Sequence, residues 1–405
     1  MRLDVLYQDQ RIGQLLGKEG RHYFEYDREF IADPKPLSPQ HLPVQKGVFE
    51  HRDGKFLGLP GLFYDSLPDH FGMEVVRKHF REKGNHSPTP LQILSYLGDR
   101  TMGALSYAPA EGGREQEMEV DLVKAALSAR QLIEHEHGAT IDPALLASGA
   151  TAGGAMPKIL IAMNAAGDQI ISGSKETPPD MEPWLLKLDT KGSTDTSKCR
   201  LEYAYFQIAK ECGIQVPDTK LVKDHNGVDH FAIRRFDRGH EDPNRRIHIH
   251  SYAGLFHLDF TDPGLDYDTL LRRTRGLTGR ESEVRQQYRR ILFNILAHNR
   301  DDHAKNFSFQ MDASGEWTLT PAYDLLFCQN DLGGNWMLLN GKRGRISQND
   351  LLELAKAHSI PNSLANEMIE QIQAALGKWP EQAKAAGLGE GYAKAIHEAI
   401  KENAI

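Results

Sequence analysis

The sequence is poor in cysteine. The three cysteines among 405 residues, Cys199, Cys212 and Cys328, are widely spaced and form no Cys-x-x-Cys pair. This scarcity argues against a disulfide scaffold and against a zinc site built from thiolates, and it is typical of a protein in a reducing cytosol. Because no cysteine stands beside a candidate base, the sequence also gives little support to catalysis by a thiolate nucleophile.

Long apolar runs and an excess of positive charge are missing as well. No apolar run approaches the length that crosses a bilayer, and the charged residues 1–5 show no signal peptide. The formal net charge of −8 disfavours a dedicated nucleic-acid binder, which usually carries a basic surplus. We therefore expect a cytoplasmic protein that has no membrane partner and does not bind DNA directly on its own.

The hydrophobic patterning predicts an α+β chain with two lobes. Residues 1–110 are typical of a small N-terminal α/β subdomain, residues 119–236 of the nucleotide-binding part of a strand-rich N-terminal lobe, and residues 237–405 of a helical C-terminal lobe. Period-two alternation and short apolar runs predict strands at 3–7, 12–16, 22–26, 159–163, 169–172, 184–188, 220–222 and 230–235. Helical periodicity predicts helices near 66–81, 89–97, 119–137, 200–212, 281–298, 349–354, 363–375 and after 391.

The most informative motif lies just after the predicted helix at 281–298. Asp301 is followed five residues later by Asn306, and Asp324 stands eighteen residues beyond Asn306. This order matches the catalytic base, metal-binding Asn and metal-binding Asp of kinases. Asp301 would accept the proton of a substrate hydroxyl, while Asn306 and Asp324 would hold Mg²⁺, which prefers oxygen ligands.

Two upstream features would supply the nucleotide. Gly153, Gly154 and Ala155 form a loop before Lys158 that lets backbone N–H groups approach phosphate oxygens, although it lacks the ending of a Walker A motif. Lys187 stands in an apolar strand and needs an anionic partner, which in a kinase is a nucleotide phosphate together with a glutamate on the next helix. Glu202 lies near the start of that helix. Alternatively, the Lys187 side chain extends to the surface.

Other interpretations of these residues remain open. Asp302 and His303 are also consistent with a structural role in the loop. The cluster of His298, Asp301, Asp302 and His303, with His248 and His250 on one face of a strand, is alternatively typical of a metal-dependent phosphoesterase. A surface strand would equally permit the two alternating histidines. A non-catalytic nucleotide-binding subunit of a repressor complex is a further alternative.

Together and in this order, the motifs resemble the HipA family of serine/threonine kinases, the toxins of bacterial toxin–antitoxin pairs. The resemblance covers nearly the whole chain. Its most specific part is Asn299-x-Asp301-x-His303-x-Lys305-Asn306 followed by Pro321-x-Tyr323-Asp324. Residues 153–158, 184–188, 235–238 and 248–255 are similar to further family segments, and residues 61–69 are similar to part of its N-terminal subdomain.

The resemblance implies a protein-kinase-like fold, ATP and Mg²⁺ bound between two lobes, and transfer to a protein hydroxyl. It adds His303, and Arg235 and Phe236 around the inter-lobe hinge, as candidate cofactor-binding residues. It further implies an aminoacyl-tRNA synthetase as a candidate substrate, a small DNA-binding antitoxin as partner, and inhibitory autophosphorylation in the Gly-rich loop. The family's usual acceptor there is Ser; the matching residue is Thr151, with Ser148 three residues upstream.

Overall fold

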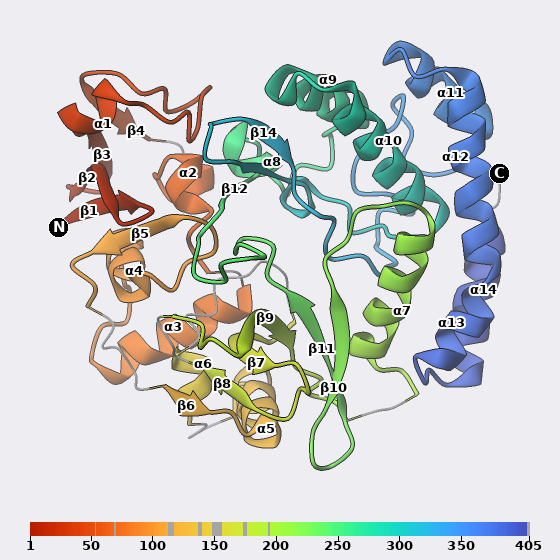
Figure 1. Cartoon of the computed structure of the whole chain (residues 1–405), viewed down its shortest axis with the longest axis horizontal. Helices are drawn as coiled ribbons and strands as arrows, with labels where there is room; N and C mark the ends of the chain where they lie inside the picture. The colour runs from red at the N-terminus through yellow and green to blue at the C-terminus, as the bar shows by residue number, and fades with distance from the viewer. Residues whose placement is uncertain are drawn as a thin grey trace.

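The computed structural model describes residues 1–52, 54–68, 70–111, 117–136, 140–147, 156–172, 176–192 and 195–402. Strands gather in the N-terminal half and helices in the C-terminal half, with the two chain ends on opposite sides of the molecule (Figure 1). The chain therefore has the mixed α+β architecture, strand-rich and then mostly helical, that the sequence predicted. Within the described residues, no helix is both long enough and apolar enough to cross a membrane.

The N-terminal part is built on a five-stranded antiparallel sheet with the order β4-β3-β2-β1-β5. Its first three strands form the predicted meander, because residues in the left-handed region at Gln8–Asp9 and Glu19–Gly20 allow tight hairpin turns. The strands are β1 (Arg2–Tyr7), β2 (Gln10–Lys18), β3 (Arg21–Tyr26), β4 (Val48–His51) and β5 (Leu105–Ala108). The helices are α1 (Arg28–Ala32), η1 (Gly54–Phe56), α2 (Gly61–Tyr64), α3 (His70–Glu82) and α4 (Pro90–Leu97).

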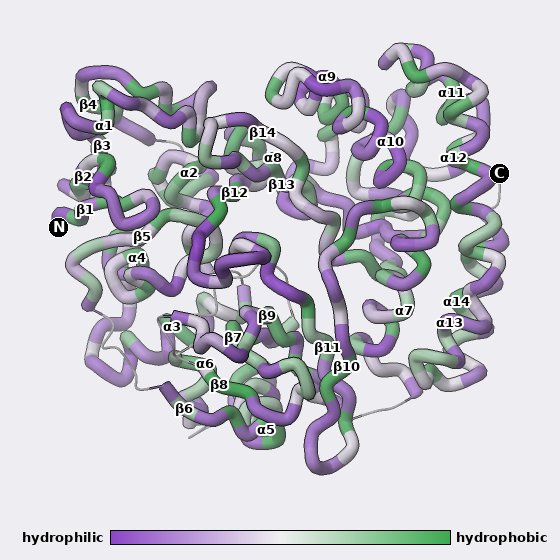
Figure 2. Tube along the Cα trace, viewed as in Figure 1, coloured by the Kyte–Doolittle hydropathy of each residue, from purple (hydrophilic) through white to green (hydrophobic). Residues whose placement is uncertain are grey.

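A six-stranded sheet follows, with the order β10-β11-β9-β7-β8-β6. Its strands are β6 (Met118–Glu119), β7 (Lys158–Asn164), β8 (Ile170–Ser172), β9 (Met181–Lys187), β10 (Thr219–Lys223) and β11 (Asp229–Arg234). One face packs against α3, α5 (Leu122–Ile133) and α6 (Pro143–Ala147), while α7 (Lys198–Glu211) contacts β10 and β11. Figure 2 shows hydrophobic stretches of α5 and β8 lying side by side in this core.

Side-chain alternation in this sheet decides where the cations point. Ile159 and Ile161 of β7 and Leu186 of β9 belong to the core shared with α5 and α6. Because successive side chains of a strand point to opposite faces, Lys158 and Lys187 fall on the other face. The two lysines are direct partners in the β7–β9 register. Strand pairing therefore places two cations together on the face away from that core.

The C-terminal part is mostly helical but not entirely so. Its helices are α8 (Tyr252–Leu255), α9 (Tyr267–Thr278), α10 (Glu281–Leu296), η2 (Ala304–Asn306), α11 (Gln348–Ala357), α12 (Asn362–Gly377), α13 (Trp379–Ala385) and α14 (Glu390–Glu402). A three-stranded sheet, ordered β12-β13-β14, lies among them, and the sequence did not predict its strands β13 and β14. Its strands are β12 (His248–Ser251), β13 (Ser308–Met311) and β14 (Trp317–Leu319).

Helix α10 carries the buried face that its periodicity predicted and delivers the chain to the predicted catalytic loop. It ends where His298 adopts a left-handed φ of 56° and the Asn299 amide donates back to the Asn294 carbonyl at 2.9 Å. This 6→1 bond is the Schellman pattern of helix termination. The Asn299 side chain also donates to Asn294 Oδ1 at 2.9 Å, so the start of the loop is fixed to the helix end.

Candidate active site

Lys187 lies at the centre of a buried ionic group. Its ammonium donates to Glu202 Oε1 on α7 at 2.7 Å and also contacts Asp324. Glu202 is fully buried and Lys187 is 5% exposed. The structure therefore brings together three of the residues that the sequence selected, from β9, from α7 and from the segment after β14.

The charges of this group act on one another in a site with little water. Burial lowers the pKa of Lys187, but the negative charges of Asp324 and Glu202 outweigh burial and raise that pKa above its ordinary value. Burial opposes ionisation of Asp324, yet the neighbouring Lys187 and Lys158 lower its pKa. For Glu202 burial dominates and raises the pKa to about 7, against the opposing charge of Lys187. At neutral pH the group contains a charged lysine beside an ionised Asp324.

Helix α7 holds Glu202 in place through contacts on both sides. The Ser197 side chain caps its first turn by accepting from the Arg200 amide, and donates to Asp189 Oδ2 at 2.6 Å. Farther along the helix, the Tyr205 hydroxyl donates to the Ala297 carbonyl at 2.7 Å, just beyond α10. The helix that carries Glu202 is thus attached to the start of the predicted catalytic loop.

The predicted base, Asp301, lies on the open side of the same region. Its side chain is 50% exposed, so a hydroxyl from another molecule can reach it. Its carboxylate is 3.8 Å from His303 Nε2, and its backbone carbonyl accepts from the Asn306 side chain at 2.7 Å. Burial lowers the pKa of His303, although the charges of Asp301 and Asp324 act against that shift. The charges of the predicted base and of the predicted metal ligand therefore both act on His303.

Asp324 adopts an uncommon backbone conformation. Its φ is 51°, in the left-handed region that few residues other than Gly, Asn and Asp enter. The preceding Tyr323 donates to the Lys305 carbonyl at 2.7 Å and stacks on Phe236 with ring centroids 5.8 Å apart. Contacts with the catalytic loop and with the segment after β11 thus hold the turn that presents Asp324.

Other candidate residues have different surroundings. Arg235 makes a two-pronged ion pair with Asp237 at 2.9 and 2.7 Å, and Asp237 also accepts from the Gly103 amide at 2.8 Å. Asp237 thus attaches the segment after β11 to the N-terminal part, and Arg235 pairs with Asp237. A nucleotide contact by Arg235 or Phe236 stays a prediction. Five candidates of the Gly-rich loop lie outside the described residues: Ser148, Thr151, Gly153, Gly154 and Ala155.

Two histidines of the metal-hydrolase alternative, His248 and His250, are used elsewhere. His248 and His250 do share one face of a strand, but both are buried rather than on the surface. His248 Nε2 lies 2.9 Å from the Leu37 carbonyl, and His250 Nδ1 pairs with Asp65. Within the parts of the chain that the structure describes, no group of three or more His, Cys, Asp or Glu side chains is arranged to hold a metal ion. These contacts give that alternative no support.

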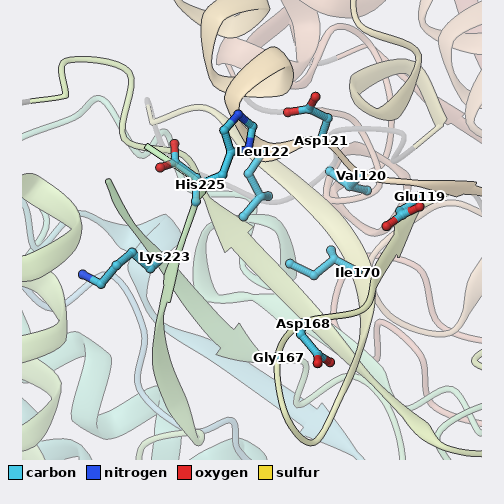
Figure 3. A pocket seen from close by; sticks show the side chains of 10 residues that line it. Glu119, Val120, Asp121, Leu122, Gly167, Asp168, Ile170, Lys223 and His225 are labelled. Atoms are coloured by element: carbon cyan, nitrogen blue, oxygen red, sulfur yellow. The ribbon is translucent and has the colours of Figure 1, made fainter. Parts of the chain in front are cut away.

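A hollow at the outer end of the six-stranded sheet is separate from this chemistry (Figure 3). Two of its acidic side chains are hydrogen-bonded to the backbone. Asp121 accepts from the first amides of α5, and Asp224 accepts from the Asn226 and Val228 amides. Its lining contains none of the predicted site residues: Glu119, Val120, Asp121, Leu122, Gly167, Asp168, Ile170, Lys223, Asp224 and His225.

Asp302, next to the predicted base, points into the protein. Its carboxylate accepts from the Trp336 amide at 2.6 Å, from the Asn335 side chain at 3.2 Å and from the Tyr267 hydroxyl. Burial raises its pKa to about 6, and these donors act in the opposite direction. The contacts agree with the structural interpretation of Asp302 and attach the segment around residue 335 to the predicted catalytic loop.

The replacement Asp302→Asn should therefore destabilise the fold. At pH 7.5 the ionised carboxylate accepts on both oxygens, whereas an amide NH₂ in either orientation would face a donor. We expect a loss of about 2–3 kcal/mol in the free energy of unfolding, because buried donors are left unpaired. Urea denaturation of the wild type and the variant measures this loss, with the exposed Asp180→Asn as control. A change within about 0.5 kcal/mol, as for ordinary surface substitutions, would contradict the role.

Comparison with known proteins agrees with the motifs. The family model of the HipA N-terminal domain matches residues 3–108, and that of the HipA-like C-terminal domain matches residues 150–379. A Sinorhizobium fredii protein named "Putative kinase Y4dM" is 25% identical over 401 residues, which cover 92% of this chain and 90% of the relative. A similarly named Haemophilus influenzae protein is 29% identical over 141 residues, or 31% of this chain and 40% of the relative.

A solved structure shares the fold over almost the full length. It is HipA in the Shewanella oneidensis MR-1 toxin–antitoxin complex of HipA, HipB and operator DNA, with a TM-score of 0.71 and 15% identity. The match covers 99% of this chain and 96% of the other. The two family models together span most of the sequence, and they confirm the resemblance predicted from the loop motifs: this chain belongs to the HipA family.

Proposed function

We propose that the protein is a cytoplasmic, ATP- and Mg²⁺-dependent serine/threonine protein kinase. The observation that carries the proposal is the buried contact of Lys187 with both Glu202 and Asp324. This arrangement links a strand lysine, a helix glutamate and the predicted metal ligand beside the Asp301 loop. The kinase names of the relatives and the family membership support it.

The residues present fit a magnesium nucleotide. Lys158 and Lys187 are adjacent on one sheet face, and a pair of cations suits phosphate oxygens. Asn306 and Asp324 carry the oxygen donors that Mg²⁺ prefers, and few protein ligands suffice where phosphates supply the rest. Among the residues that the structure describes, the buried Glu202 Oε2 has no hydrogen-bond partner. When bound, Mg²⁺–ATP would supply the phosphoryl group and neutralise its developing charge.

The chain's own residues would position and deprotonate the acceptor. Lys187 would hold phosphate oxygens, with Glu202 fixing its ammonium from α7. Asp301 would orient the substrate hydroxyl and accept its proton. His303, which lies 3.8 Å from the Asp301 carboxylate, would help to hold that side chain in position. Catalysis would depend mostly on positioning and electrostatic stabilisation rather than on a covalent protein intermediate.

The family context extends the proposal to a growth-inhibiting toxin. We propose a small DNA-binding antitoxin as its partner, by analogy with the complex of the structural relative. An aminoacyl-tRNA synthetase is the proposed substrate class, and Thr151 or Ser148 the proposed site of inhibitory autophosphorylation. These parts rest on the resemblance of the motifs.

Incubation with labelled ATP tests the proposal. Wild-type protein with Mg²⁺ and cell lysate should label a protein, and mass spectrometry of the kinase itself should find phosphate on Thr151 or Ser148. Removal of Mg²⁺ with EDTA should abolish both signals, because the phosphoryl group then lacks its neutralising cation. Nucleotide binding without any transfer would instead favour the non-catalytic binding subunit, and label that persists in EDTA would contradict the metal requirement.

A further inference from the structure

A short N-terminal segment, residues 61–65, packs against α8 and against Lys305 of the predicted catalytic loop. The backbones of α2 and α8 touch so closely that a Cβ on Gly61 would lie 2.0 Å from the Gly254 carbonyl oxygen. The Gly61 amide donates to His257 Nε2 at 3.1 Å. This contact joins residues almost 200 positions apart in the sequence, so the N-terminal part is fixed to the C-terminal part at this point.

Asp65 strengthens the same contact with charge. Its carboxylate accepts from the Ser251 amide at 2.7 Å and from the Ser251 hydroxyl at 2.8 Å, and it pairs with His250 Nδ1 at 2.5 Å. The helix that follows, α8, contacts η2, and the Tyr252 amide donates to the Phe307 carbonyl at 2.8 Å. Asp65 is therefore connected through β12 and α8 to the turn that contains Asn306.

The neighbouring Tyr64 reaches the catalytic loop itself. The Lys305 ammonium lies over the Tyr64 ring and over the Phe260 ring, 4.9 Å from each centroid. The carbonyl of Lys305 accepts from Tyr323, directly before Asp324. Lys305 is thus held at its side chain by one aromatic ring from the N-terminal part and at its backbone by the segment that presents the second predicted metal ligand.

We infer that the N-terminal part positions Asn306, the predicted Mg²⁺ ligand of the catalytic loop, with Tyr64 as the positioning residue that acts through Lys305. The inference rests on the proposed kinase function and deepens it. Asn306 directly follows Lys305, so a shift of Lys305 moves a predicted Mg²⁺ ligand. Displacement of a catalytic group by about 1 Å can lower a rate by about a hundredfold.

The test compares Tyr64→Leu, which removes the ring, with Tyr64→Phe, which keeps its face. We expect Tyr64→Leu to lower kcat by roughly tenfold or more and to raise the half-saturating Mg²⁺ concentration, since the cation–π contact is lost. Tyr64→Phe should behave like the wild type. Lys305→Met should show the same kind of defect, and the double variant should be little worse than Lys305→Met alone, because loss of the ammonium already removes its contact with Tyr64.

The same replacement at Tyr23 is the matched control, because that side chain lies on β3 of the same N-terminal sheet and contacts Glu50. Tyr23→Leu should leave kcat and the Mg²⁺ requirement unchanged. A folded Tyr64→Leu with wild-type kcat and Mg²⁺ requirement would overturn the inference, as would additive effects of Tyr64→Leu and Lys305→Met. If Tyr64→Leu does not fold, the Mg²⁺ requirement of Lys305→Met is the test. A raised requirement would support the inference, and an unchanged requirement would overturn it. No transfer by the wild type would instead reject the proposed function and this inference with it.

Discussion

Asp301→Asn should reduce phosphoryl transfer by about 10²–10⁴-fold in kcat, the range expected when a positioned general base is lost. The amide keeps the shape of the side chain but cannot accept the hydroxyl proton. Since Asp301 is half exposed and its carboxylate lies 3.8 Å from His303, its ion-pair partner, we expect the fold and the affinity for ATP to stay unchanged. Initial rates with labelled ATP, and thermal unfolding of both proteins, measure the two expectations.

The control for Asp301→Asn is the same replacement at Asp180, an exposed residue before β9. It should leave kcat unchanged. A rate for Asp301→Asn within about threefold of the wild type would be too small for the loss of a general base and would remove that role from Asp301.

Lys187→Met should have the second large effect, on both activity and stability. It leaves the carboxylates of Glu202 and Asp324 buried without their cation. Loss of one partner of a buried pair costs about 3–5 kcal/mol, so the free energy of unfolding should fall by that amount. The raised pKa of Lys187 means that its contribution is present below the ordinary lysine pKa and is lost only as the pH rises through the still higher folded-state value. Titration of the lysine itself therefore leaves the deficit unchanged across neutral pH, whereas ionisation of Glu202, whose pKa lies at about 7, should make the deficit larger as the pH rises.

Glu202→Gln separates the two partners of Lys187. It keeps a hydrogen-bond acceptor and removes at most one charge, because the Glu202 pKa of about 7 leaves that carboxyl partly protonated at neutral pH. It should therefore destabilise less than Lys187→Met while still raising the KM for ATP. Urea denaturation and steady-state kinetics measure these differences. Equal stability of Lys187→Met and the wild type would contradict the buried ionic group, and an unchanged KM for ATP in both variants would contradict its nucleotide role.

Local pattern was sufficient for much of the fold. The apolar face of α10, the alternation of β1 and the short apolar runs of β7 and β9 were predictable because each pattern extends over several residues. The start of α4 was also predictable, since Thr89 caps it with Gln92 and Pro90 occupies its first turn. The spacing of Asp301, Asn306 and Asp324 could be recognised because these residues lie within two short segments.

Contacts between distant segments were not visible in the sequence. β13 and β14 have only four and three residues, too few for a clear alternation, so the small C-terminal sheet was missed. The burial of His248 and His250 depends on Leu37 and Asp65, some two hundred residues away. Tyr64 and Lys305 likewise meet only in the folded chain. Pairing across such separations carries no local periodicity that could reveal it.

The backbone at Asp324 restricts which amino acids can occupy that position. A left-handed φ of 51° disfavours residues with a branched or bulky side chain, and it favours glycine, asparagine and aspartate. Glycine would relieve the backbone but has no oxygen to offer a cation, and asparagine would keep an oxygen while losing the charge that faces Lys187. Aspartate alone meets all three demands of conformation, ligand and charge. In a library of all twenty amino acids at this position, selection for activity should therefore return aspartate almost exclusively.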